Sequence, residues 1–246
     1  MTKTALITGA GSGVGRAAAQ TLLAHGWQVA LVGRRQEQLA QTASGHERKS
    51  LILSFDVSDP VAVEAGFKTL EAKWGRLDML FNNAGSGTPP TTPDELSTET
   101  WLSVVGVNLN GSFFCAREAF RIMRHQTPQG GRIINNGSIS AHAPRPGSIA
   151  YTATKHAITG LTKTLCLDGR PFNIVASQID IGNAATPMTE RMVKGTLQAD
   201  GEMRPEPRMD VQHVADMVLH IAEMPLATNI LNMTIMASKM PFIGRG

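Results

Sequence analysis

The stretch Thr8-Gly9-Ala10-Gly11-Ser12-Gly13-Val14-Gly15 decides the fold class of this chain. It follows a short apolar run, Ala5 to Thr8, and precedes a helical pattern, Val14 to His25. Glycines between a strand and a helix let backbone N–H groups approach a diphosphate at the positive end of the helix. Valine at position 14 departs from the strict G-x-G-x-x-G pattern, and Arg16 excludes a P-loop. We predict a dinucleotide-binding turn; a glycine-rich turn that binds no ligand is the alternative.

Short apolar runs alternate with helical patterns along the whole chain. Strands are predicted at Ala5 to Thr8, Gln28 to Gly33, Leu51 to Phe55, Met79 to Asn82, Arg132 to Asn136, Ile174 to Ile179 and Ile230 to Met236. Helices are predicted at Val14 to His25, Gln36 to Ser44, Pro60 to Trp74, Gly111 to Gln126, Tyr151 to Leu167 and Val211 to Glu223. This order indicates an α/β fold: a Rossmann-like, doubly wound parallel sheet of about seven strands with helices on both faces.

The chain has 246 residues, of which 42% are hydrophobic and 17% charged, so it can bury a sizeable core. We find no linker and no internal repeat, and we expect residues 1–246 to form one dinucleotide-binding and catalytic domain. One irregular tract, Thr186 to Arg208, mixes three prolines with Met, Gly and charged residues. Such a tract resembles a mobile surface insertion, and we predict that it is a substrate lid.

Charge and cysteine content argue against several classes of protein. The formal net charge is +3, and no run of like charges occurs, so binding to nucleic acid through a phosphate-tracking patch is not expected. The two cysteines, Cys115 and Cys166, have neither the spacing of a metal site nor the density of a disulfide scaffold. The sequence shows no signal-peptide core and no membrane span. We expect a cytoplasmic protein with no bound metal and no membrane partner.

The end of the second predicted strand bears on cofactor choice. A dinucleotide fold that prefers NAD places an acidic residue there, about twenty residues beyond the glycine turn, to bind the ribose 2′-hydroxyl. This strand ends Val32-Gly33-Arg34-Arg35, and an arginine pair without a carboxylate favours a 2′-phosphate. We therefore predict NADP (NADPH) as the cofactor, with NAD less favoured. The alternative is that Arg34 and Arg35 are solvated residues at a helix start, where a cation opposes the helix dipole.

Tyr151 and Lys155 are one helical turn apart in the segment Tyr151-Thr-Ala-Thr-Lys155, on one face of a predicted helix. A nearby ammonium favours phenolate over phenol, which suits a general acid or base. Ser138 lies upstream at the end of a predicted strand. Together with the glycine turn, these residues indicate chemistry on a substrate oxygen.

The chain resembles the short-chain dehydrogenase/reductase family over nearly its whole length. The resemblance is carried by motifs in the family's order: Thr8 to Gly15, Asp56-Val57, Asn82-Asn-Ala-Gly85, Val107-Asn108-Leu-Asn-Gly111, Gly137-Ser138, and Tyr151 with Lys155. It implies four catalytic residues. Tyr151 would exchange a proton with the substrate oxygen, Lys155 would assist Tyr151 and bind the nicotinamide ribose, Ser138 would orient the substrate oxygen, and Asn108 would hold a relay water.

The resemblance also implies a cofactor groove, in which Asp56 contacts adenine and the Asn82 to Gly85 turn lines the wall. The full set of predicted cofactor-binding residues is Thr8, Gly9, Ser12, Gly13, Val14, Gly15, Arg34, Arg35, Asp56, Val57, Asn83, Ala84, Gly85, Tyr151, Lys155, Ile181 and Thr186.

Two departures from the family pattern bear on this cofactor groove. The usual Pro-Gly turn after the sixth strand is replaced by Ser177 to Asn183, so Ile181 and Thr186 are the candidates for carboxamide contacts. Within that segment, Asp180 is either a cofactor neighbour or a structural residue paired with a backbone amide. Ser12 stands where many NADP-using members have Arg, which weakens the prediction of NADP.

The substrate should lie between the loop after Ser138 and the tract from Thr186 to Arg208. His142 and Arg145 are candidates to bind it, although exposed surface roles are more common for such residues. Met188, Met192 and Met203 are either an adaptable apolar cover or core residues. The helices predicted at Gly111 to Gln126 and Tyr151 to Leu167 carry apolar residues outside their main apolar stripes, among them Phe113 and Phe120. These residues favour a homo-oligomer, a tetramer or a dimer as is common in the family. Burial against the chain's own sheet explains them equally well.

These observations favour an NADP-preferring oxidoreductase that interconverts a carbonyl and an alcohol on a small or medium-sized organic molecule. In this reading the cofactor carries hydride and Tyr151 is the general acid or base. A cofactor-binding regulator or scaffold with little or no turnover is the alternative, and a lyase or epimerase with retained cofactor is a third possibility.

Overall fold

A seven-stranded parallel sheet forms the centre of the computed structural model, which describes residues 2–243. The strands lie in the order β3-β2-β1-β4-β5-β6-β9. Their bounds are β1 (Thr4–Thr8), β2 (Gln28–Gly33), β3 (Ser50–Ser54), β4 (Met79–Asn82), β5 (Gly131–Asn136), β6 (Ile174–Gly182) and β9 (Asn232–Met236). The chain order reverses between β1 and β4, and open α/β sheets bind ligands outside the carboxyl ends of the strands at such a point.

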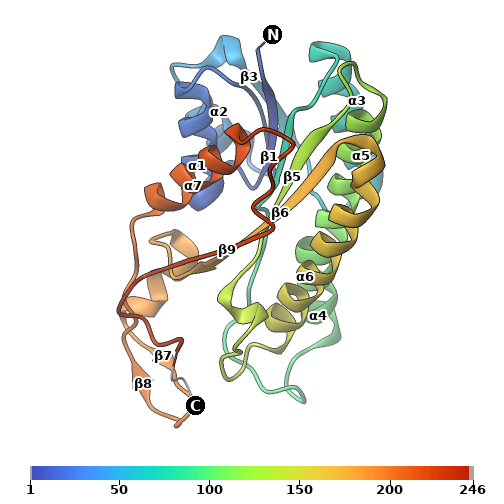
Figure 1. The fold of residues 1–246 in the computed structure, drawn as a ribbon. Helices are drawn as coiled ribbons and strands as arrows, with labels where there is room; N and C mark the ends of the chain where they lie inside the picture. The colour runs from blue at the N-terminus through green and yellow to red at the C-terminus, as the bar shows by residue number, and fades with distance from the viewer. Residues whose placement is uncertain (1, 244–246) are drawn as a thin grey trace.

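Helices cover both faces of the sheet, which confirms the predicted doubly wound fold. Figure 1 shows α1, α2 and α7 on one side and α3, α5 and α6 on the other. The helices are α1 (Gly13–Ala24), α2 (Gln36–Ala43), α3 (Pro60–Trp74), α4 (Thr98–Val105), α5 (Gly111–His125), α6 (Ile149–Gly169) and α7 (Val211–Glu223).

Alternate side chains of each central strand enter two different cores. In β1, Ile7 packs in the core that contains Leu22 of α1 and Val218 of α7. Its neighbour Leu6 packs in the opposite core, with Phe67 of α3. Because both faces of the sheet are covered, every position of β1 and β4 is buried, and the sequence shows continuous apolar runs instead of alternation.

The bounds of β2, β4, α3 and α7 agree with the sequence prediction, and most other elements differ by a residue or two. Two differences matter for the site. β6 runs on past Ile179 to Gly182 because β9 continues to pair with it there, residue by residue up to Gly182 opposite Met236. The sequence analysis also missed α4 and the π-helical turn Gly106–Asn110 that joins it to α5.

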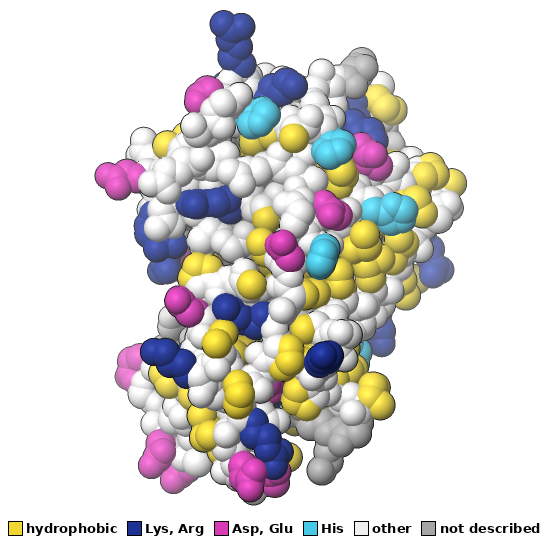
Figure 2. Space-filling view, turned by 90° about the vertical axis from the view of Figure 1, so that its left-hand side faces the viewer, with side chains coloured by type: hydrophobic (Ala, Val, Ile, Leu, Met, Phe, Trp, Pro, Cys, Tyr) yellow, Lys and Arg dark blue, Asp and Glu magenta, His cyan; other side chains and the backbone are white. Residues whose placement is uncertain are grey.

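The tract from 186 to 208 lies beyond the carboxyl ends of the strands (Figure 1). It contains a 3-10 helix, Pro187–Val193, and a short antiparallel ribbon of β7 (Thr196–Leu197) and β8 (Met203–Arg204). We call this tract the insertion. Figure 2 shows the face that carries α1, α7 and the insertion, where basic and acidic side chains are interspersed. No helix within residues 2–243 is long and apolar enough to cross a bilayer.

Candidate active site

Two adjoining cavities lie at the carboxyl ends of the strands. The first, about 340 Å³, runs from the glycine turn to Arg34 and Asp56, and we call it the cofactor cleft. The second, about 370 Å³, has Ser138 and Tyr151 in its wall and the insertion along one side, and we call it the substrate cavity. The two cavities meet at shared lining residues, namely Val14, Asn136, Thr186 and Met188.

The glycine turn fits a diphosphate group. Gly9 and Gly13 have φ values of 67° and 53°, a left-handed conformation that glycine adopts without strain. A Cβ on Gly15 would collide with the carbonyl oxygen of Gly9 and with the side chain of Asn83, so only glycine lets α1 start this close to the turn. Ser12 is the N-cap of α1 but makes no side-chain capping bond, which leaves the first amides of the helix available to an anion.

Thr8 and Asn83 join the glycine turn to the turn after β4. The Thr8 hydroxyl accepts hydrogen bonds from the amides of Asn83 and Ala84, both at 2.9 Å, and the Asn83 side chain donates to the Thr8 carbonyl at 2.9 Å. Thr8 is buried and lines neither cavity. Its side chain therefore shapes the cleft from behind, whereas Asn83, Ala84 and Gly85 form the wall itself.

The far end of the cofactor cleft carries both signs of charge. Arg34 Nη1 lies 3.6 Å from Oδ2 of Asp56, and both side chains are open to solvent. Partial burial acts to raise the pKa of Asp56, but hydrogen bonds from Ser58 and the charge of Arg34 outweigh it and lower the pKa below its ordinary value. Arg35 and Val57 line the same end, as does Gln38, whose buried Oε1 has no hydrogen-bond partner within residues 2–243.

Asn108 lies in the π-helical turn between α4 and α5 and is buried. Its Oδ1 accepts from the amide of Ser86 at 2.8 Å, and its Nδ2 donates to the Ser86 carbonyl at 2.9 Å and to Thr154 Oγ1 of α6 at 3.1 Å. These bonds hold the turn after β4 against the helix that carries Tyr151. Ser86 lines the cofactor cleft, and its buried Oγ has no partner in the described part of the chain, so it is available to a ligand.

Tyr151 and Lys155 lie on one face of α6, as their spacing predicts. Lys155 Nζ is 5.5 Å from the centroid of the Tyr151 ring and donates to the Asn136 carbonyl at 2.6 Å. Lys155 is buried and lines neither cavity, whereas Tyr151 lines the substrate cavity. The ammonium therefore lies behind the phenol, at the junction with the cofactor cleft marked by Asn136.

Ser138 lies at the carboxyl end of β5, and a buried carboxylate fixes its backbone. Its amide donates to Oδ1 of Asp180 at 2.9 Å. Its Oγ accepts from the amide of Ser140 at 3.1 Å, which leaves the hydroxyl hydrogen available for a substrate oxygen. Asp180 has a relative exposure of 0%, so the structure supports the reading in which it is a structural residue paired with a backbone amide.

The second carboxylate oxygen of Asp180 is also satisfied. Oδ2 accepts from the ring of His142 at 2.8 Å and from Nδ2 of Asn232 at 2.9 Å, while Gln178 donates to Oδ1 at 2.7 Å. The His142 side chain is 45% exposed, which agrees with the expected surface position, and the contact with Asp180 holds its ring. It does not line the substrate cavity.

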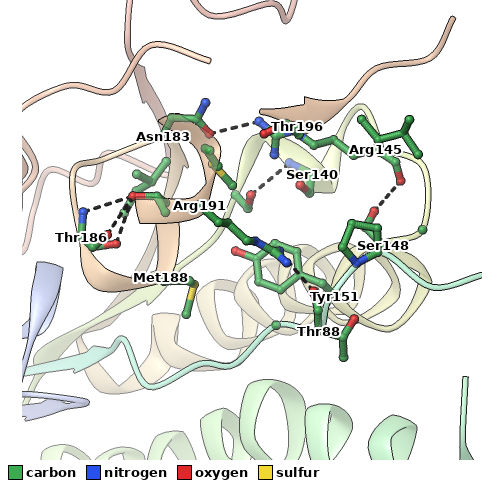
Figure 3. Close-up of a pocket in the computed structure, with 18 of the residues that line it drawn as sticks. Thr88, Ser140, Arg145, Ser148, Tyr151, Asn183, Thr186, Met188, Arg191 and Thr196 are labelled. Carbon is green, nitrogen blue, oxygen red and sulfur yellow. Dashed lines mark hydrogen bonds between the residues drawn. The ribbon is translucent and has the colours of Figure 1, made fainter. Parts of the chain in front are cut away.

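Arg145 departs from the surface role that is more common for such a residue. Its guanidinium pairs with the carboxylate of Glu206 in the insertion and donates to Oδ1 of Asn183 at 3.0 Å. The side chains of Arg145 and Glu206 are 14% and 1% exposed. Arg145 lines the substrate cavity (Figure 3), but Glu206 already balances its charge.

The insertion contributes an apolar cover. Met188, Met192 and Met203 all line the substrate cavity, and Met203 is 64% exposed, so these residues form a cover and not a core. Thr186 touches both cavities, and its Cγ2 would be 3.2 Å from a Cβ on Gly13. Ile181 lines the substrate cavity.

The structure thus brings most of the predicted site residues together around the two cavities. Four of them, Thr8, Gly15, Asn108 and Lys155, lie just behind the lining. Sequence reasoning missed Gln38, Ser86, Asn136, Asn183 and Arg191, which line one or both cavities. The sequence offered a signal for Ser86, which directly follows the Asn82 to Gly85 motif, and for Asn136, which directly precedes Gly137-Ser138.

Comparisons with known proteins agree with this geometry. The sequence model described as short chain dehydrogenase matches residues 3–196. A 3beta-hydroxysteroid dehydrogenase from Mediterraneibacter gnavus is 38% identical over 192 residues, which cover 77% of this chain and 68% of that protein.

Solved structures of similar fold match nearly the whole chain. A 3-ketoacyl-(acyl-carrier-protein) reductase from Brucella melitensis, complexed with NADH, has a TM-score of 0.83 at 25% identity over 95% of this chain and 96% of its own. A variant of actinorhodin polyketide ketoreductase, with NADPH, has a TM-score of 0.85 at 26% identity over 96% of both chains.

Proposed function

The chain belongs to the short-chain dehydrogenase family, and on that premise we propose that it is an NADP-preferring oxidoreductase. The reaction interconverts a carbonyl and an alcohol on a small or medium-sized organic molecule. The observation that carries this proposal is the position of Tyr151 and Ser138 in the wall of one cavity, with Lys155 behind the phenol and the cofactor cleft adjoining at Asn136.

Each of these residues has a role in the proposed reaction. Tyr151 donates its phenolic proton to the carbonyl oxygen during reduction and takes it back during oxidation. Lys155 favours the phenolate that remains, because its ammonium is close to the ring. Ser138 donates a hydrogen bond to the substrate oxygen and so orients the carbonyl carbon. Asn108 fixes the helix that carries Tyr151 through its bond to Thr154.

The cofactor cleft fits a nicotinamide dinucleotide, which supplies or accepts the hydride when bound. The open amides of α1 suit the diphosphate, and the unpartnered Oγ of Ser86 and Oε1 of Gln38 are free for polar groups of the ligand. At the junction of the cavities, Thr186 and Ile181 are the candidates for contacts to the carboxamide.

A preference for NADP is supported by Arg34 and Arg35 at the end of β2. Both line the cleft, and Arg34 is held by an exposed pair with Asp56, which contributes at most about 1 kcal/mol. A 2′-phosphate would therefore compete well for the guanidinium. The similar solved structures hold NADH in one case and NADPH in the other, so the arginines carry this part of the proposal.

We also propose that the chain acts as one domain with the insertion as its substrate lid, and that it forms a homo-oligomer. Exposed apolar side chains on α4 and α5, among them Leu102 and Phe113, support the second point.

A panel assay tests the activity. Aldehydes and ketones are offered with NADPH, and alcohols with NADP, to the wild type and to Tyr151→Phe, which removes only the hydroxyl. We expect turnover on part of the panel and a loss of about 10²- to 10⁴-fold in Tyr151→Phe. Fluorescence titration with NADPH is the control, because Tyr151→Phe should still bind the cofactor.

The alternative is a cofactor-binding regulator with the same fold. Binding of NADPH without turnover in either direction on a broad panel would favour it. The completeness of the Asn108, Ser138, Tyr151 and Lys155 set argues for the enzyme, because folding alone does not require these residue types.

A further inference from the structure

One arginine in the substrate cavity has no carboxylate partner. Arg191 extends from the 3-10 helix of the insertion towards the loop after β4 (Figure 3), and its Nη2 donates to the Thr88 carbonyl at 3.1 Å. No ion pair within residues 2–243 involves it. Its chain neighbour Glu190 is exposed and does not line the cavity. A guanidinium has five N–H donors, so the bond to Thr88 leaves others for a ligand.

The rest of the cavity lining does not balance this charge. None of the described residues that line the substrate cavity is an aspartate or a glutamate. The other lining arginine, Arg145, is paired with Glu206. Lys155 adds a second positive charge behind Tyr151. Behind the wall, the buried carboxylate of Asp180 at Ser138 offsets this second positive charge. The charge that an anion meets in the lining itself is therefore that of Arg191, which attracts it.

Part of the same cavity lining is apolar. Met188, Met192 and Leu197 of the insertion line the cavity, and Ile181 lies in the wall formed by β6. Such a cavity accommodates a short hydrocarbon segment between a polar group at Tyr151 and a charge at Arg191.

We propose that Arg191 binds a carboxylate on the substrate, so that the preferred substrates are oxo acids or hydroxy acids with a short apolar chain. A single unbalanced guanidinium matches the single charge of a carboxylate. The assignment of the reacting end of the substrate depends on the function proposed above. The assignment of the anion site depends only on the position of Arg191 in the cavity lining and on the pairing of its guanidinium.

Matched substrates test the specificity. The ketones 2-, 4- and 5-oxohexanoate are each compared with their methyl esters, which are neutral and only one methyl group larger. The wild type should prefer at least one acid over its ester, and Arg191→Gln should lower the acid-to-ester ratio of kcat/KM about fivefold, mainly through KM. Arg204→Gln is the control, because Arg204 is on the same insertion, is paired with Asp200 and Glu202, and does not line the cavity. An unchanged ratio in Arg191→Gln overturns the proposal.

A binding measurement separates this proposal from the proposed activity. Calorimetric titration of hexanoate and of hexanamide into protein saturated with NADPH requires no turnover. Tighter binding of hexanoate to the wild type, lost in Arg191→Gln and kept in Arg204→Gln, supports the anion site even where no ketone is reduced. The absence of any preference for hexanoate overturns the anion site, whether or not the protein reduces neutral ketones.

Discussion

Replacing Glu206 by glutamine is expected to loosen the insertion over the substrate cavity. The Glu206 carboxylate accepts hydrogen bonds from Arg145, from Nδ2 of Asn183 at 2.6 Å and from Nε2 of Gln198 at 3.0 Å. Arg145 comes from the loop after β5 and Asn183 from the end of β6, whereas Gln198 belongs to the insertion itself. This one carboxylate therefore connects the insertion to the loop after β5 and to the end of β6.

The expected loss of stability of the closed insertion depends on which hydrogen bonds glutamine can still accept at position 206. Removing one partner of a buried ion pair costs about 3–5 kcal/mol. Glutamine keeps one carbonyl acceptor, and Arg145 is near enough to the surface to reach water, so we expect about 2–3 kcal/mol here. If the insertion opens without the sheet, this loss appears as a roughly 30- to 150-fold rise in the population of the open form.

Limited trypsin digestion under native conditions measures this opening, since Lys194 lies in the insertion and directly follows its 3-10 helix. Cleavage after Lys194, followed by mass spectrometry, should be many times faster in Glu206→Gln, and KM for the substrate should rise. Glu202→Gln is the matched control, because Glu202 makes an exposed pair with Arg204 in the same insertion, and such an exposed ion pair adds little to stability. Equal cleavage rates in the two variants would refute the assigned role of Glu206.

Three further outcomes are expected. Burial acts to raise the pKa of Glu206, but hydrogen bonds from Arg145, Asn183 and Gln198 outweigh it and lower the pKa below its ordinary value of 4.5. The carboxylate should therefore stabilise the closed insertion fully above about pH 4.5 and lose this effect as the pH falls through the lower pKa of the folded protein. Digestion with pepsin at stepped pH measures the opening of the insertion. Arg34→Ala should weaken NADPH about tenfold or more and NADH far less, and equal losses in fluorescence titrations would contradict the 2′-phosphate assignment. Gly15→Ala should abolish cofactor binding and lower Tm, because its Cβ meets the Gly9 carbonyl; a normal Kd would show that the turn can shift.

The fold was predictable because its signals are local. Continuous apolar runs mark strands that are buried on both faces, and Asp59 with Pro60 marks the start of α3, where the Asp59 side chain accepts from the amides of Val61 and Ala62. The missed α4 shows the limit of such signals. It spans only Thr98–Val105, buries only Val104, and continues into a π-helical turn instead of ending at a breaker.

The candidate site was predictable where one short segment holds the information. Tyr151 and Lys155 share a face of α6 because of their spacing alone, and the glycine turn is a single run of residues. The pairing of Arg145 with Glu206 was not predictable, since the two residues are distant in sequence and meet only through the path of the insertion. Arg191 stands out only after Arg145 is known to be neutralised.

The segment that replaces the family's Pro-Gly turn links the sheet to the catalytic serine. Ile181 lies opposite Ile235 in the β6–β9 ladder, where a proline would have no N–H to offer. With the strand continued, adjacent side chains point to opposite faces. Ile181 lines the substrate cavity, while Asp180 reaches the amide of Ser138 from the other face. Gly137 makes this approach possible, because a Cβ there would collide with the Asp180 carboxylate. The altered segment therefore fixes Ser138 from behind, a role that the backbone of a Pro-Gly turn would not provide.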